Sequence, residues 1–240
     1  MAEDRGVGFS KEPAAPKPTG TKYFFGIGID RYKYWKPLRN AGNDVTEVLD
    51  LLLRQYDFEP QHTLLLKDSD ATRSRIVNQL HTYTMTGTLS ENDSLLIYFS
   101  GHGHLDENND GYWVPAEAQK DDIDSLIPNT ILRDKIRNMK CRHVLVVSDS
   151  CFSGSLIARS DDNQDADKLV ATSLMQRSSR RIMTSGGHFE PVSDGSNRNS
   201  PFAEALISEL THNQKPFFML DELFSSVRKI TWNNTNQMPE

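Results

Sequence analysis

The sequence predicts an α/β fold in which helices cover both faces of a mostly parallel, twisted β-sheet. Short continuous apolar runs alternate along the chain with segments whose apolar residues recur at helical spacing. This alternation is typical of parallel sheets, because the connecting helices bury their strands on both faces. In addition, two of the apolar runs end in the most reactive side chains of the chain, His102 and Cys151. Ligands bind at the carboxyl ends of strands in such sheets, so the second observation fits the same architecture.

The elements are expected in the following order. Residues 1–20, with three prolines and three glycines among mixed charges, predict a disordered leader ahead of one domain, residues 21–240. Continuous apolar runs predict strands at residues 23–29, 63–66, 95–99, 144–147 and 181–184. Helical spacing predicts helices at residues 43–56, 71–83, 129–139, 201–210 and 220–230. Residues 158–180 break the alternation with acidic and amide residues followed by arginines, and we expect them to form an exposed, mobile loop.

Composition and charge exclude several classes of function. The formal net charge of −6 argues against nucleic acid as a partner, since phosphate binding requires a basic face. Every apolar run is too short to span a membrane. The two cysteines, Cys141 and Cys151, cannot form a disulfide framework, and no secretory signal follows Met1. We therefore expect a cytoplasmic protein, and the sequence leaves its oligomeric state open.

Cys151 and His102 are candidates for nucleophilic catalysis. A thiolate attacks amide carbonyls well when a nearby imidazole takes its proton and later protonates the leaving amine. His102 precedes Cys151 by 49 residues, and if the two strands are neighbours both side chains lie over the same edge of the sheet. The backbone N–H groups of Gly103 and Cys151 are then candidates for the oxyanion hole. Asp149, however, is unexpected beside a nucleophile, because a neighbouring carboxylate raises the pKa of a thiol.

Two motifs resemble those of the caspase-like cysteine peptidases, and in particular the metacaspases and bacterial orthocaspases. They are Ser100-Gly101-His102-Gly103 and Asp149-Ser150-Cys151-Phe152-Ser153-Gly154, each after an apolar run, and the resemblance extends from about Lys22 to Glu240. It implies the caspase-like three-layer sandwich. It also implies a cysteine endopeptidase in which Cys151 forms a covalent acyl-enzyme, His102 is the general acid and base, and no cofactor is required.

The same resemblance gives Asp149 a different role. In metacaspases this position belongs to the S1 pocket, together with the positions that match Asp44 and Ser100 here. A further pocket residue, a cysteine in metacaspases, aligns with Ala41, so the pocket departs from the family pattern at this position. Two carboxylates that converge on one pocket repel each other unless a cation lies between them. A guanidinium is the best such cation, because it can bind a carboxylate through two hydrogen bonds. We therefore expect protein or peptide substrates cleaved after Arg, and second after Lys.

Basic residues near the mobile loop become candidate self-cleavage sites if this specificity holds. They are Arg159, Lys168, Arg177, Arg180 and Arg181, and the alternative is that they are solvated loop charges.

A possible calcium site is a further alternative. Asp106, Asn108, Asp110 and Glu117 fit the EF-hand pattern, but the flanking helices are missing and Pro115 interrupts the segment. Related proteins form a hairpin here that need not hold a metal.

A catalytically silent signalling module is the competing function. Caspase-like folds also serve as regulated effectors in cell death, stress and defence, where a regulatory domain, a partner or a small ligand orders the loops around the cysteine. Family members continue past a segment like Gln237-Met238-Pro239 into a further strand, which this sequence does not reach.

Overall fold

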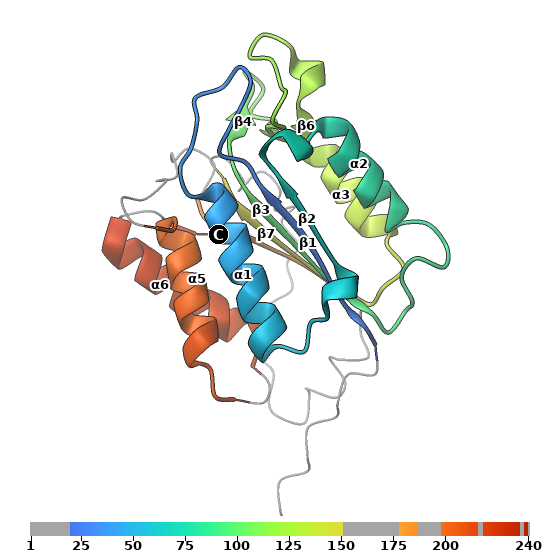
Figure 1. Cartoon of the computed structure of the whole chain (residues 1–240), viewed down its shortest axis with the longest axis vertical. Helices are drawn as coiled ribbons and strands as arrows, with labels where there is room; N and C mark the ends of the chain where they lie inside the picture. The colour runs from blue at the N-terminus through green and yellow to red at the C-terminus, as the bar shows by residue number, and fades with distance from the viewer. Residues whose placement is uncertain (1–19, 151–177, 187–197, 216–217, 236–237, 240) are drawn as a thin grey trace, which may run out of the picture.

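A five-stranded, entirely parallel sheet forms the middle layer of the molecule, with the strand order β2-β1-β3-β7-β8 (Figure 1). The computed structural model describes residues 20–150, 178–186, 198–215, 218–235 and 238–239 of the chain. The strands are β1 (Lys22–Gly28), β2 (Thr63–Lys67), β3 (Ser94–Ser100), β7 (His143–Asp149) and β8 (Ser179–Thr184). Strand β3 lies at the centre, in register with β1 on one side and with β7 on the other.

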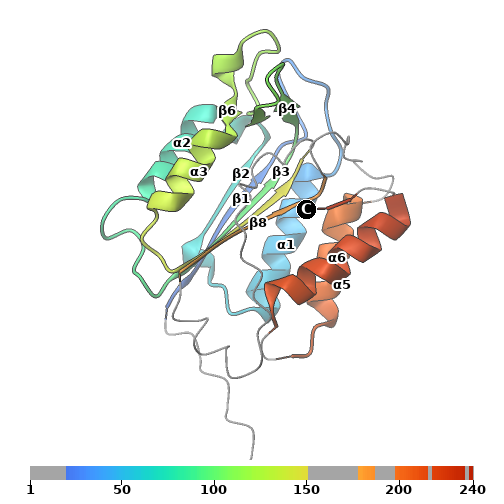
Figure 2. The same cartoon turned by 180° about the vertical axis from the view of Figure 1, so that it is seen from behind.

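Helices cover both faces of this sheet (Figures 1 and 2). The helices α1 (Ala41–Gln55), α5 (Pro201–His212) and α6 (Leu220–Thr235) lie on one face, and α2 (Arg73–Thr82) and α3 (Asn129–Asn138) lie on the other. Each face has its own apolar core. The first contains Val45, Phe202 and Val227, and the second contains Ile76 and Ile136. The predicted three-layer α/β sandwich is confirmed.

A glycine in β1 allows α1 to approach the sheet closely. A Cβ atom on Gly28 would lie 2.5 Å from Cγ1 of Val45 and 2.6 Å from the carbonyl oxygen of Ala41. These separations are well inside van der Waals contact, so a larger residue would push the first turn of α1 away from the sheet. Because α1 carries Asp44, the glycine also fixes the height of this side chain above the strand ends.

A second, antiparallel sheet follows β3 and was not predicted as strands. It consists of β4 (Gly103–Leu105), β5 (Gly111–Trp113) and β6 (Ile127–Pro128), and β4 and β5 form a hairpin. Three residues are too few for an apolar period to show in the sequence. Short 3-10 helices occupy Pro60–His62, Asp68–Asp70 and Ile123–Ser125.

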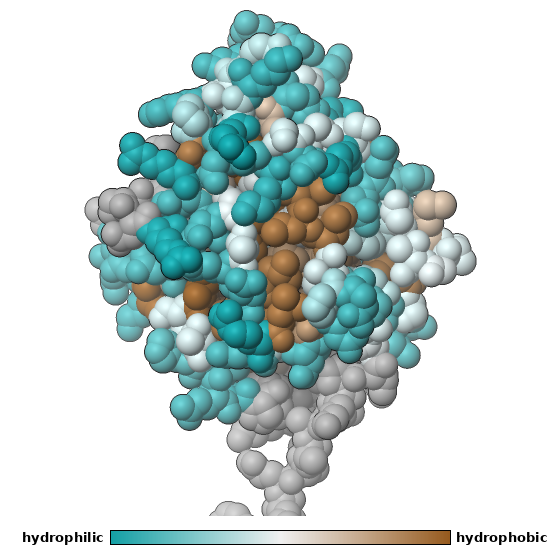
Figure 3. Space-filling view, viewed as in Figure 1, coloured by the Kyte–Doolittle hydropathy of each residue, from teal (hydrophilic) through white to brown (hydrophobic). Residues whose placement is uncertain are grey.

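The surface shows where the edge of the main sheet is uncovered. Hydrophobic residues form a strip near the middle of the face in Figure 3, over β1 and β2 between α1 and α2. Strand β2 is an edge strand, and Thr63, Leu64 and Leu65 are only half-buried. In the described part of the chain, no helix is both long enough and apolar enough to cross a membrane.

All ten predicted helices and strands are present, with boundaries that differ by a few residues. One difference corrects a prediction: Arg180, which was assigned to the end of the mobile loop, lies in β8, which begins at Ser179. The physical reason is that the Arg180 guanidinium donates to several backbone carbonyls, which offsets the cost of half-burying an arginine in the sheet. The leader residues 1–19 and most of the loop, residues 158–177, lie outside the described residues.

Candidate active site

The candidate catalytic residues follow two neighbouring strands. Strands β3 and β7 are hydrogen-bonded to each other, with Ser100 opposite Asp149 at their carboxyl ends. The strands that precede His102 and Cys151 are therefore neighbours, as a Cys–His catalytic pair requires. His102 is two residues beyond β3, whereas Cys151 lies outside the described residues.

His102 is held by the loop that follows β1. Its backbone N–H donates to the Tyr32 hydroxyl at 2.8 Å, and its ring Nε2 lies 2.7 Å from the carbonyl oxygen of Lys36. The rings of Tyr32 and Trp35 pack against the imidazole, at centroid distances of 4.8 and 5.8 Å. A carbonyl oxygen only accepts, so Nε2 carries a proton, and in the neutral ring Nδ1 is the nitrogen with the lone pair. The arrangement therefore selects one tautomer and leaves Nδ1 as the basic atom.

The backbone of Gly103 is oriented by the β4–β5 hairpin. The backbone N–H of Val114 donates to the carbonyl oxygen of His102 at 3.0 Å, and that of Asp106 donates to the carbonyl oxygen of Asp110 at 3.0 Å. These two pairs are therefore hydrogen-bonded positions of the antiparallel ladder. Hydrogen-bonded and non-hydrogen-bonded pairs alternate in antiparallel sheets. Gly103, opposite Trp113, is therefore at a non-hydrogen-bonded position, and its N–H points away from β5.

Asp44, Ser100 and Asp149, the residues predicted to form the S1 pocket, lie near one another on the α1 side of the strand ends. Asp44 and Asp149 are 1% and 4% exposed, and the Ser100 hydroxyl donates to Oδ2 of Asp44 at 3.2 Å. Two buried carboxylates at one strand edge form a strongly acidic site.

Two residues of this acidic site were missed by the sequence analysis. Nδ2 of Asn199 and the backbone N–H of Ser200 both donate to Oδ1 of Asp44 at 3.0 Å, and the Ser200 hydroxyl donates to Asp149. Ser200 also caps α5 by accepting from the N–H of Ala203 at 3.0 Å. The pair Ser200-Pro201 is a helix-start signal, but it indicates only the cap and not the contact with Asp149.

Burial and mutual repulsion shift the titration of this site. Burial, and after it the negative charge of Asp149, raise the pKa of Asp44 to about 8, although hydrogen bonds from Ser200, Asn199 and Ser100 act in the opposite direction. Burial also raises the pKa of Tyr98 well above its usual value, and the charges of Asp149 and Asp44 add to the effect. A cation bound between the two carboxylates would relieve the repulsion.

Two of the EF-hand candidates, Asp106 and Glu117, accept hydrogen bonds from backbone N–H groups. The Asp106 carboxylate accepts from the N–H groups of Asn108 and Asp110 and from the Tyr112 hydroxyl, at 2.8 to 3.0 Å. Oε1 of Glu117 accepts from the N–H of Arg73 at the start of α2, at 2.8 Å. Within the described ranges, no three His, Cys, Asp or Glu side chains are grouped as metal ligands, so Asp106, Asp110 and Glu117 do not form such a group.

Of the self-cleavage candidates, Arg159, Lys168 and Arg177 lie outside the described residues. Arg180 and Arg181 are in β8, where the chain is hydrogen-bonded to β7. Peptidases bind their substrates as extended, unpaired segments, so cleavage at either arginine would first require β8 to leave the sheet.

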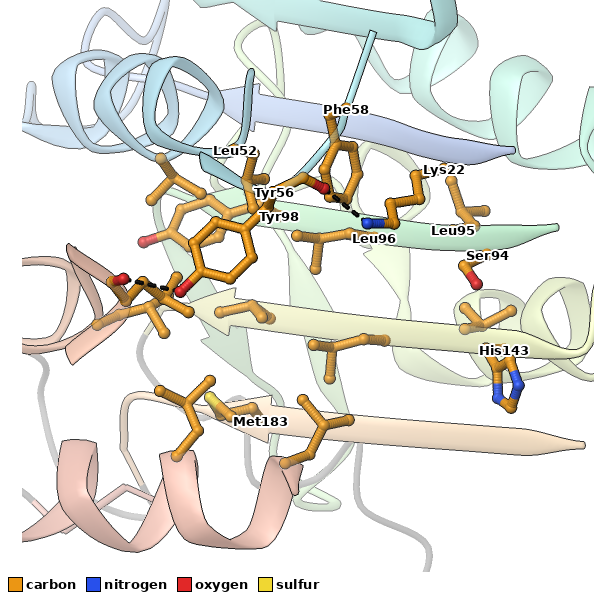
Figure 4. Close-up of a pocket in the computed structure, with 18 of the residues that line it drawn as sticks. Lys22, Leu52, Tyr56, Phe58, Ser94, Leu95, Leu96, Tyr98, His143 and Met183 are labelled. Carbon is orange, nitrogen blue, oxygen red and sulfur yellow. Dashed lines mark hydrogen bonds between the residues drawn. The ribbon is translucent and has the colours of Figure 1, made fainter. Parts of the chain in front are cut away.

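A large apolar cavity lies apart from the acidic site. Its volume is about 310 Å³, and Figure 4 shows it on the sheet face that α1 and α5 cover. Lys22, Ser94 and His143, the first residues of β1, β3 and β7, lie at one end of it, and Tyr98 and Met183 lie further along the strands. The cavity is thus on the α1 side of the sheet and extends from the amino ends of the strands.

Comparisons with known proteins agree with the fold. Residues 25–240 match the caspase domain of the C14 peptidases. Metacaspase-1 of Eremothecium gossypii is 25% identical over 155 residues, which are 58% of this chain and 33% of that protein. Metacaspase-4 of Arabidopsis thaliana is 28% identical over 147 residues, which are 55% of this chain and 33% of that protein. The chain thus spans about a third of the length of these relatives. A Geobacter sulfurreducens protein of known crystal structure has the same fold, with a TM-score of 0.63, 16% identity and 92% of each chain covered.

Proposed function

The chain belongs to the caspase domain family, and from this premise we propose that it is a cysteine endopeptidase that cleaves after Arg and, less efficiently, after Lys. The observation that carries the proposal is the pair of buried carboxyl groups, Asp44 on α1 and Asp149 at the end of β7, opposite the end of the strand that precedes His102. Burial and Asp149 raise the pKa of Asp44, and a cationic side chain bound between the two groups would favour the charged form of both.

The reaction begins with the Cys151 thiol and the imidazole of His102. Nδ1 of His102 takes the thiol proton, and the thiolate sulfur attacks the carbonyl carbon of the scissile bond. The N–H groups of Gly103 and Cys151 stabilise the resulting oxyanion. When the carbon–nitrogen bond breaks, the histidine returns its proton to the leaving amine, and a thioester remains on Cys151. Water then attacks the thioester with His102 as the base, and the acid product and the free thiol are released.

The Lys36 carbonyl assists both proton transfers. Its hydrogen bond to Nε2 holds the ring in one tautomer, and it stabilises the imidazolium that forms in each step. Specificity for Arg over Lys follows from shape, because a planar guanidinium can bond to two carboxylates at once while an ammonium is a point charge.

The test uses fluorogenic peptides that end in Arg, Lys or Asp and differ in no other residue. They are incubated with the wild type and with the Cys151→Ala variant, with and without calcium. We expect turnover of the Arg peptide, slower turnover of the Lys peptide and none with Cys151→Ala. Cleavage of the Asp peptide would overturn the pocket assignment. Inactivity towards every peptide under every condition would instead support the silent signalling module.

Self-cleavage follows from the same specificity and is tested by mass spectrometry of the purified chain. The expected sites are Arg159, Lys168 and Arg177. New chain ends after these residues should form with the wild type and be absent with Cys151→Ala.

A further inference from the structure

The loop between β1 and α1 contacts the catalytic histidine and carries many positive charges. Its residues 31–39 read Arg-Tyr-Lys-Tyr-Trp-Lys-Pro-Leu-Arg. The Tyr32 hydroxyl and the Lys36 carbonyl bind His102 at 2.8 and 2.7 Å, and the Trp35 ring packs on its imidazole. The loop therefore contacts both the backbone and the ring of His102, the residue that we propose protonates the leaving amine.

The base of the loop is closed by two aspartates. Oδ1 of Asp68 accepts from the N–H groups of Asp30 and Arg31 at 2.9 Å, and the N–H of Leu38 returns to the carbonyl of Asp30 at 2.9 Å. The Asp30 carboxylate also caps α1 by accepting from the N–H groups of Ala41 and Gly42 at 2.8 and 3.0 Å. These hydrogen bonds hold the backbone of the loop in place at both ends.

One of the four cations of this loop forms an ion pair with a carboxylate in the described part of the chain. Arg31 forms an ion pair with Asp68 at 2.7 Å. Lys33, Lys36 and Arg39 are exposed, and among the described residues no carboxylate lies within ion-pair distance of them. Lys33 lies over the exposed ring of Tyr34, with its Nζ 5.0 Å from the ring centroid. Within the described residues, these three cations are therefore available to bind an acidic group from outside the chain.

The role of His102 indicates which part of the substrate lies near this loop. His102 protonates the amine of the residue that follows the scissile bond, so that part of the substrate leaves on the histidine's side. We propose that residues 31–39 form a subsite for acidic side chains in the one or two positions directly after the scissile bond. The inference rests on the proposed function and adds to it: the preferred substrate has Arg before the cleaved bond and Asp or Glu after it.

The experiment compares internally quenched peptides that share Arg before the bond and carry Asp-Asp, Asn-Asn or Lys-Lys after it. The readout is the ratio of kcat/KM for the Asp-Asp peptide to that for the Asn-Asn peptide, so each enzyme is its own reference. We expect a ratio of about five to ten in low salt, with Lys-Lys below Asn-Asn. The ratio should fall towards one at about 0.5 M salt, because these exposed charges are screened.

Two triple variants, each of which removes three positive charges, distinguish an effect of this loop from an effect of the net charge of the protein. Lys33→Gln, Lys36→Gln and Arg39→Gln together should bring the ratio close to one. Arg54→Gln, Arg137→Gln and Lys140→Gln change exposed cations that are not on this loop and should leave the ratio as in the wild type. Equal cleavage of Asp-Asp and Asn-Asn by the wild type would overturn the subsite while leaving the Arg specificity intact. Failure to cleave any Arg peptide would overturn the proposed function itself.

Discussion

At the residue scale, Asp44 and Asp149 carry most of what distinguishes this site. Both are buried, and the partners of Asp44 come from β3 and from the residues before α5. Hydrogen bonds to Asp44 favour its charge, while burial and Asp149 oppose it more strongly. The charged form of Asp44 is consequently unfavourable in the folded protein.

Asp44→Asn should raise the stability of the protein, and the gain should grow with pH. The pKa of Asp44 is about 8 in the folded chain, above its ordinary value, so the folded state holds a proton that the unfolded state has lost. The wild type therefore loses stability as the pH rises from about 4 to about 8, and the amide does not. Thermal unfolding at pH 5 and at pH 8.5 should show a larger advantage of the variant at the higher pH, on the order of a few kcal/mol.

The same variant should lose activity on Arg peptides by on the order of a hundredfold, because a partner of a buried cation is removed. Asp50→Asn is the matched control, since Asp50 is an exposed carboxylate on the same helix. It should change neither the pH dependence nor the activity. An Asp44→Asn protein that is less stable than the wild type at pH 8.5 would contradict the assignment.

The two acids of this site could be identified from the sequence, whereas Asn199 and Ser200, which donate hydrogen bonds to them, could not. Asp44, Ser100 and Asp149 could be matched to motifs at helix and strand ends. Asn199 and Ser200 are 155 and 156 residues from Asp44 along the chain, and they reach it only because α5 packs beside α1. No local pattern encodes that distance, so only the assembled fold could identify them.

At the element scale, α5 begins inside the acidic site. Ser200→Ala should cost about 1 kcal/mol of stability through the lost cap, and it should also lower kcat/KM for Arg peptides because Asp149 loses a donor. Thr72→Ala removes the corresponding cap of α2, where the hydroxyl accepts from the N–H of Arg75. Thr72→Ala should therefore lower the unfolding temperature without changing peptide cleavage. Equal effects of both variants on cleavage would show that Ser200 acts only as a cap.

The side chain of Arg180 in β8 binds carbonyl groups at and just beyond the end of α3. The Arg180 guanidinium donates to the carbonyls of Ile136, Met139, Cys141 and Arg142, at 2.8 to 3.2 Å. Ile136 lies in the last turn of α3 and Met139 is its C-cap residue, so the arginine adds hydrogen bonds at the carboxyl end of this helix, where basic side chains are favourable.

Arg180→Lys should cost about 2 kcal/mol in the free energy of unfolding, because one ammonium cannot reach carbonyls that a planar guanidinium bridges. Arg181→Lys is the matched control on the next residue. Arg181 is about half exposed, and its ion pair with Asp221 is 3.8 Å long. This control should stay within about 0.5 kcal/mol of the wild type in denaturant titration. Similar losses for the two variants would exclude the capping role.

At the scale of the whole molecule, the sequence predicted the layers but not how tightly each is packed. Alternation of apolar runs and helical segments determines a parallel sheet with two covered faces, whatever the details of the side chains. Packing density depends on how individual side chains interlock, which no periodicity encodes. The core against α2 and α3 contains many fully buried residues, including Leu80, whereas the α1 side contains the 310 Å³ cavity.

The two sides of the sheet should therefore respond in opposite ways to the same substitution. Leu96 lines the cavity from β3, so Leu96→Phe can extend into empty space and gain contacts, and we expect stability to rise by up to about 1 kcal/mol. Leu80, which is 1% exposed in the opposite core, has no such space, and Leu80→Phe should cost about 1 to 3 kcal/mol. Denaturant unfolding of both variants at one pH measures the difference. Destabilisation of similar size in both would mean that the cavity closes in solution and that the two cores are packed alike.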